Sequence, residues 1–165
     1  MVSPLLIIAL GLGGAFALGL LREDRRALAY GLTLAVLSAM TLISLGWVVA
    51  FWQGATTLEI TTAGTPPPFA INLRVGVAEA ALLALITATG FGAALSMRRG
   101  LLEHGRRAMA VLLVLVMALT GLVMTRDIFN LFVFFELVII ATAGLVLLSE
   151  DARALAAGFK YLVVA

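Results

Sequence analysis

Residues 125–144 read TRDIFNLFVFFELVIIATAG, and this stretch decides the fold. From residue 128 to residue 148 the run is mostly apolar and has a single charged residue, Glu136. About 20 apolar residues are enough for a helix to cross the ~30 Å hydrocarbon layer of a bilayer. Asp127 stands at the start of the run, where its carboxylate can cap a helix and interact with the positive end of the helix dipole. The stretch therefore predicts a transmembrane helix.

The whole chain has the composition of a membrane protein. Hydrophobic residues make up 63% of it, charged residues make up 12%, and the mean hydropathy is +1.16. Soluble domains have about a quarter of their residues charged. We therefore predict an all-α fold, a polytopic transmembrane helix bundle that forms one domain over residues 1–165. About five full transmembrane helices and the start of a sixth are expected near residues 4–21, 27–52, 75–97, 108–124, 128–148 and 155–165, with an external Pro/Gly/Thr-rich loop over 53–73.

The last predicted segment is too short to cross a membrane. At ~1.5 Å per residue, residues 155–165 give ~16 Å of helix. We therefore expect the natural polypeptide to continue, or a second chain to complete the bundle.

Lysine and arginine are distributed unevenly over the predicted loops. Nine of the 11 fall in alternate loops on one side of the bundle, and only Arg74 and Arg126 fall on the other. Cytoplasmic loops carry the excess of these residues. The pattern predicts an N-terminus and a 53–73 loop on the outside, and a chain end on the cytoplasmic side, in the inner (plasma) membrane of the cell.

Several classes of site are missing from the sequence. There is no cysteine, which excludes disulfides and thiolate metal sites. No Gly-rich phosphate loop and no cluster with metal-ligand spacing is present. The arginines lie in short loops instead of a long basic tract, which argues against nucleic acid as a partner. We therefore predict no cofactor, no metal and no nucleic acid, with the lipid bilayer as the surrounding partner.

Glu136 is the main candidate for a functional residue. It follows Asp127 by nine positions, or ~13 Å of helix, which places it close to the middle of the bilayer. An ionised carboxylate at that depth is expensive unless it faces protein or water and has a cationic partner. The approach and withdrawal of a lysine would release and restore its proton, which is what a proton relay requires. The alternative is a neutral, hydrogen-bonded contact between helices, and Ala143 and Gly144 are small enough to admit a neighbouring helix.

Four other polar residues are weaker candidates. Glu79 lies only ~6 Å past Val75, where water or Arg74 can reach it, so a structural role at the membrane interface is favoured. Lys160 either snorkels to the inner surface or takes part in an inner proton entry path. Asn130 either lines a hydrated path or forms a hydrogen bond between helices. His104 is expected to be a solvated loop residue, although histidine can shuttle protons near neutral pH.

Four stretches of the sequence resemble one known family. They are DIFNLFVFFEL at 127–137, the preceding Thr125-Arg126, GFKYLVV at 158–164 and PPPFAINL at 66–73. Together they resemble the antiporter-like subunits shared by Mrp sodium/proton antiporters, membrane-bound hydrogenases and respiratory complex I, with the D-type Mrp subunit as the best match. The resemblance covers only the N-terminal portion of such a subunit.

The resemblance implies a function for Glu136. In the family, the matching glutamate pairs with a lysine on the seventh helix, and the pair takes part in proton translocation; this sequence ends before that helix. The family often has an aspartate at the start of its third helix, where this chain has Gly76. The implied partners are other membrane subunits and protons, and the resemblance leaves open whether sodium is exchanged.

Two roles are compatible with that resemblance. The first is an ion-translocating subunit, not catalytic by itself, of an antiporter, a hydrogenase or an NADH:quinone oxidoreductase-like complex. The second is a structural subunit that anchors other components in the membrane without conducting ions.

Overall fold

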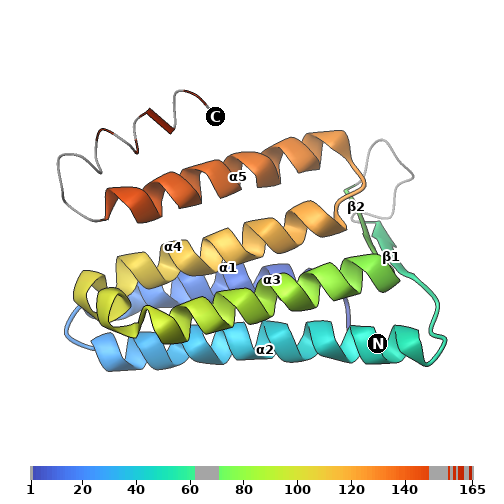
Figure 1. The fold of residues 1–165 in the computed structure, drawn as a ribbon, viewed down its shortest axis with the longest axis horizontal. Coiled ribbons are helices and arrows are strands. Elements are labelled where there is room, and N and C mark those ends of the chain that lie inside the picture. The colour runs from blue at the N-terminus through green and yellow to red at the C-terminus, as the bar shows by residue number, and fades with distance from the viewer. Residues whose placement is uncertain are drawn as a thin grey trace.

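The computed structural model describes residues 2–61 and 71–148, and also Ala156, Gly158, Lys160, Tyr161 and Val164. Among these residues, five helices run roughly parallel along the long axis, and a pair of short strands lies at one end (Figure 1). The predicted start of a sixth helix, 155–165, lies mostly outside the described residues, and the five residues described there have helical backbone. The elements are α1 (Leu5–Leu20), α2 (Arg26–Trp52), β1 (Leu58–Thr61), β2 (Asn72–Val75), α3 (Val77–Ser96), α4 (Arg98–Met124) and α5 (Ile128–Leu147).

Helix α4 is the centre of the bundle. It packs against α1, α2, α3 and α5. Of the 18 consecutive residues that form its most apolar part, 56% are buried, compared with 28% for α5. The core around it consists of fully buried side chains such as Leu37, Leu83 and Leu113. Helix α5 lies at the edge and packs mainly on α4 (Figure 1). One long face of α5 is consequently left uncovered by the described residues.

In the part of the chain that the structure describes, four helices, α2 to α5, are long and apolar enough to cross a membrane. Helix α1 is apolar but has only 16 residues, which is about 24 Å. It ends where Leu21 takes an extended conformation, immediately before the charged residues 22–26. The all-α polytopic bundle predicted from the sequence is therefore found, with one helix shorter than the expected full span.

The connection between the third and fourth membrane segments is helical, not the predicted loop. Residues 98–107 were expected to form a loop, but α4 starts at Arg98 and continues to Met124 with one interruption at Gly105, where φ is +71°. The residues before Gly105 contain no proline, and Leu101 is 4% exposed, so burial of that side chain favours a helical turn. Glycine adopts positive φ without the steric penalty of a side chain, which permits the change of direction. His104 is thus helical and exposed, with its ring Nδ1 2.9 Å from the carbonyl oxygen of Gly100.

The predicted loop over 53–73 is also only partly correct, because β1 and β2 form an antiparallel pair. Leu58 pairs with Val75, and Thr61 pairs with Asn72. Leu73 and Val75, at 1% and 0% exposure, alternate with half-buried Asn72 and exposed Arg74, so the apolar face of β2 packs onto the bundle. This alternation is the usual signature of a half-buried strand. Residues 62–70, which include the three prolines, lie outside the described residues.

Buried hydroxyl groups in the helices bond to their own backbone. Thr33, Ser44, Thr87 and Thr120 are 0% exposed, and each donates a hydrogen bond to a carbonyl oxygen three or four residues earlier. In apolar surroundings an unpaired hydroxyl would be unfavourable. These residues are therefore compatible with a bundle surrounded by lipid.

Candidate functional site

Glu136 lies on the uncovered face of α5. Its side chain is exposed, as are Phe129 (75%), Phe132 (62%) and Ile140 (58%), whereas Phe134 and Ile139 on the other face are buried. Within the described part of the chain, the Glu136 carboxylate has no hydrogen bond and no ion pair. A carboxylate is thus presented near the middle of a 20-residue helix among exposed apolar side chains. The cation expected to accompany it is not among the described residues.

The small residues near the end of α5 contribute to packing against α4. A Cβ atom added to Gly144 would lie 3.4 Å from Cγ1 of Val111, which is ordinary contact. Ala143 is 1% exposed. The neighbouring helix that we expected these residues to admit is therefore α4, while the part of α5 around Glu136 remains open.

The start of α5 is fixed by two side chains. Asp127 Oδ1 accepts a hydrogen bond from the backbone N–H of Phe129 at 3.1 Å, which is an N-cap. Asn130 is 7% exposed, and its Nδ2 donates to Thr125 Oγ1 at 3.2 Å. The amide of Asn130 therefore joins the first turn of α5 to the connection from α4, instead of reaching to a separate helix.

Glu79 connects three elements at the strand end of the bundle. One carboxylate oxygen accepts the backbone N–H of Gly76 at 2.9 Å and caps α3, and the other forms an ion pair with Arg126. The backbone N–H of Arg126 donates to the carbonyl oxygen of Asn72 at 2.9 Å, and Leu73 pairs with Thr125 in an isolated β-bridge. Glu79 thus ties α3 to strand β2 and to the α4–α5 connection.

Sequence reasoning expected water or Arg74 near Glu79 and missed Arg126, which forms the ion pair. A glutamate three residues into a helix is half of a capping box, and that signal was available at Gly76 and Glu79. The ion pair with Arg126 joins residues that are 47 positions apart in the sequence. No local pattern predicts such a contact.

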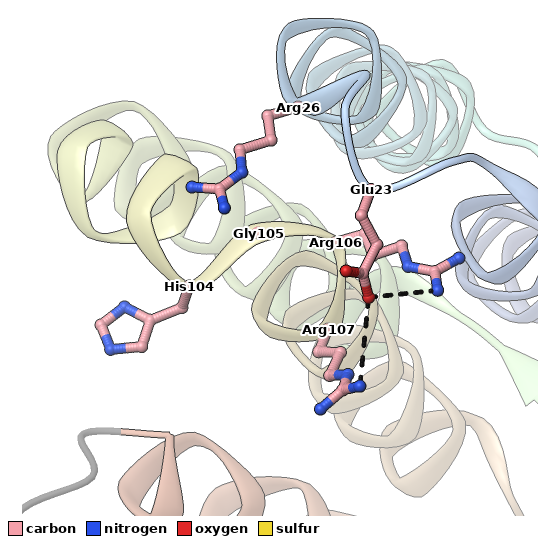
Figure 2. A pocket seen from close by; sticks show the side chains of 6 residues that line it. All are labelled: Glu23, Arg26, His104, Gly105, Arg106 and Arg107. Atoms are coloured by element: carbon pink, nitrogen blue, oxygen red, sulfur yellow. Dashed lines mark hydrogen bonds and ion pairs between the residues drawn. The ribbon is translucent and has the colours of Figure 1, made fainter.

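The remaining candidates are not brought together. Lys160 is exposed, and no ion pair joins it to Glu136 among the described residues. His104 lies on α4, at the end of the bundle opposite the strands (Figures 1 and 2). Within the described part of the chain, no group of three or more His, Asp or Glu side chains is arranged to hold a metal ion.

The fold and the composition define a class of protein, a polytopic helical membrane protein with a carboxylate on an uncovered helix face. No family model matches the chain. Among curated proteins, it is 28% identical to a Staphylococcus saprophyticus protein named as antiporter subunit mnhD2, over 99% of this chain and 33% of that protein. It is 36% identical to a Rhizobium meliloti protein named as a D-type subunit of a K⁺/H⁺ antiporter, over 60% of this chain and 18% of that protein.

Two solved structures share the fold. The chain superposes on a chain of the membrane-bound sulfane sulfur reductase, an archaeal respiratory membrane complex, with a TM-score of 0.87, 29% identity, and coverage of 97% of this chain and 33% of that one. A chain of the Mrp complex from Dietzia sp. DQ12-45-1b gives a TM-score of 0.81 with 21% identity, covering 96% and 31%, and shows the fold alone.

These comparisons confirm the resemblance read from the sequence. The chain is a multi-pass membrane protein homologous to D-type antiporter subunits. It spans about a third of the length of the first of these relatives, and about a third of the matching chains in the solved structures.

Proposed function

We propose that the chain is a subunit, or the N-terminal portion of a subunit, of a membrane complex that translocates protons or exchanges cations for protons. Its relatives named as antiporter subunits support this assignment, as does the fold shared with chains of two membrane complexes. Other membrane subunits are the proposed partners. Protons are the proposed substrate, and the chain offers no feature that identifies sodium.

The observation that carries the proposal is the position of Glu136. Its side chain stands about halfway along an apolar helix, on a face whose other members are exposed phenylalanine and isoleucine side chains. A charged residue facing lipid at that depth is strongly disfavoured, and such residues typically face a protein interior or a water-filled path. We therefore infer that further helices cover this face of α5. They would come from the rest of the natural polypeptide or from a second chain, and they would supply a cation.

Glu136 would then act as a proton relay. Apolar surroundings favour the protonated form of a carboxylic acid, and a nearby cation favours the ionised form. A conformational change that moves a cation towards Glu136 and away again would make the carboxyl group release and rebind a proton. Lys160, Glu79 and Asn130 remain secondary proposals for such a path.

The arrangement in the membrane is part of the proposal. We propose a single transmembrane domain with five spans and the start of a sixth, in the inner (plasma) membrane, with α1 crossing despite its length. Basic residues concentrate at the end that carries the α1–α2 and α3–α4 connections, so this end is placed in the cytoplasm. The strands and the N-terminus are placed outside.

The test is Glu136→Gln in the natural protein, assembled with its own subunits. The substitution keeps the size of the side chain and removes the exchangeable proton. Cation-induced proton movement in inverted membrane vesicles is expected to fall about tenfold or more, because a positioned proton-transfer group typically contributes at least that much. Glu103→Gln is the matched control, since the Glu103 side chain is exposed and its carboxylate has no hydrogen bond or ion pair in the described residues.

The proton relay and the non-conducting anchor are distinguished by measuring transport activity relative to the amount of assembled complex. If the assembled Glu136→Gln variant keeps full activity, a neutral side chain suffices at this position. That result would contradict the proton relay and favour the non-conducting anchor. Loss of activity with normal assembly supports the relay. Glu136→Asp, which keeps a carboxylate on a shorter side chain, is expected to retain part of the activity.

A further inference from the structure

A polar cavity of about 220 Å³ lies at the end of the bundle opposite the strands. Three arginine side chains from two elements surround it, together with one carboxylate, so the cavity carries an excess of positive charge. Figure 2 shows these side chains around the break in α4. The lining residues are Glu23, Arg26, His104, Gly105, Arg106 and Arg107.

Two of the arginines are held in place by the ends of helices. Arg106 Nη1 donates to the carbonyl oxygens of Gly19 and Leu21 at 2.7 and 2.5 Å, at the end of α1. Arg26 Nη1 donates to the carbonyl oxygens of Leu102 and Glu103 at 3.1 and 3.2 Å, just before the break in α4. Arg106 Nη2 also pairs with Glu23 Oε1 at 3.4 Å. A guanidinium group has five N–H donors, so both arginines keep free donors after these bonds. The cavity is thus bordered by fixed cations that can still bind an anion.

Arg107 is the least constrained cation of the cavity. Its side chain is 79% exposed, and its only ion pair in the described residues is with Glu23, at 4.0 Å. An exposed pair at this distance contributes little. The guanidinium of Arg107 is therefore available to a ligand without loss of a strong internal contact.

An apolar cavity of about 240 Å³ adjoins the polar one. Its walls include Leu101 and Leu112 of α4 and Leu145 of α5, and His104 lines both cavities. The ring of His104 points away from the arginines (Figure 2), and His104 is a lining residue of both cavities. A soluble anion would use only the polar half of this arrangement. A molecule with an anionic head and a hydrocarbon chain would use both.

We propose that these two cavities form one binding site for an anionic phospholipid. The phosphate of the head group is bound by Arg26, Arg106 and Arg107, and the upper part of one acyl chain lies in the apolar cavity. The position fits the proposed topology, because the residues that line the polar cavity belong to the α1–α2 connection, the start of α2 and the break in α4, at the end of the bundle that we propose to face the cytoplasm. Basic pockets between transmembrane helices are known sites for anionic head groups.

Lipid binding to the natural protein in detergent, measured by native mass spectrometry, tests the site. Phosphatidylglycerol is expected to bind more tightly than phosphatidylcholine of the same chain length. Arg107→Gln is expected to weaken phosphatidylglycerol binding about fivefold, the effect of one basic residue near an anionic head group, and to leave phosphatidylcholine binding unchanged. Arg25→Gln is the matched control, because Arg25 is a neighbouring exposed arginine outside the lining.

A second variant tests the apolar half. Leu145→Trp fills the apolar cavity and is expected to weaken binding of long-chain phosphatidylglycerol. The control Leu82→Trp, at an exposed position on α3, is expected to leave that binding unchanged. Equal effects of Arg107→Gln and Arg25→Gln would overturn the site in favour of diffuse surface charge. Displacement of the lipid by inorganic phosphate, with no effect of Leu145→Trp, would overturn the lipid in favour of a soluble anion.

Discussion

At the scale of single residues, Glu79 has the clearest structural task. Its side chain is 18% exposed, and it satisfies a backbone N–H at the start of α3 while it pairs with Arg126, which is 42% exposed. The pair lies near the end of the helices, where water screens the charges, so the ion pair alone is expected to be weak. The capping bond adds to it, because the first N–H groups of a helix otherwise have no partner.

Glu79→Ala is therefore expected to destabilise the protein by about 1 to 2 kcal/mol, the sum of a lost cap and a half-exposed ion pair. Glu79→Gln, which can still accept the Gly76 N–H, is expected to lose less. The free energy of unfolding in mixed micelles measures both. Glu103→Ala serves as the control, and an equal loss in that variant would contradict the specific role of Glu79.

Local chemistry made some of the candidate site predictable and left the rest hidden. Asp127 directly precedes a long apolar run, and a cap needs only neighbouring residues, so its hydrogen bond to Phe129 could be anticipated. Glu136 stood out because one charge in an apolar run is unusual. Its outward direction could not be read, because periodicity says which residues share a face and not which face the bundle covers. The contact between Glu79 and Arg126 depends on the packing of three elements.

At the scale of elements, the contact between α4 and α5 fixes the position of the Glu136 helix. Gly121 of α4 faces the ring of Phe134 so closely that an added Cβ would overlap the ring carbons. Phe134 is 7% exposed and cannot easily move aside. The absence of a side chain at Gly121 therefore allows α5 to approach α4.

Gly121→Ala is expected to destabilise the protein by about 1 to 3 kcal/mol through overpacking. The matched control is Gly13→Ala on α1, where an added Cβ meets nothing within 4 Å. Alanine should be neutral or slightly stabilising there, since it favours helix more than glycine does. Thermal unfolding in detergent measures both variants. A Gly121→Ala protein as stable as the parent would show that α5 is not held by this contact.

Helix positions followed from hydropathy, but two features of the elements did not. The apolar runs located α2, α3 and α5 to within about two residues at each end. The turns before Gly105 were missed because their arginines and glutamate resemble a loop in composition, while the burial of Leu101 that favours helix depends on the neighbouring helices. The strands were missed because each has only four residues, and the region around them is rich in threonine, proline and glycine.

At the scale of the whole molecule, the two ends of the bundle differ in chemistry. One end has the strand pair and the Glu79 network, and the other has the arginine cavity (Figures 1 and 2). The long sides are apolar, with Phe16, Leu42 and Leu85 among the exposed side chains. A bilayer is the environment that suits such a surface, and the two ends would then face opposite compartments.

The absence of cysteine gives a direct test of the proposed orientation. Single substitutions Thr61→Cys on β1 and Asp24→Cys between α1 and α2 place one thiol at each end of the bundle. A membrane-impermeant maleimide added to intact cells is expected to label Thr61→Cys at once, and Asp24→Cys only after permeabilisation. The reverse pattern would invert the topology. Leu113→Cys, in the core, should resist labelling in both conditions.

In the proposed orientation, Arg106 and Arg26, which bond to the ends of α1 and of the first part of α4, act at two stages in the life of the protein. While the chain is being inserted, any basic side chain retains its loop on the cytoplasmic side, and lysine would serve as well as arginine. After folding, Arg106 and Arg26 each bridge two carbonyl oxygens at a helix end. Lysine lacks the planar fork of donors for that second task. An arginine-to-lysine change here would thus leave the orientation that we propose unchanged, but would weaken the contacts that hold the polar end of the bundle together.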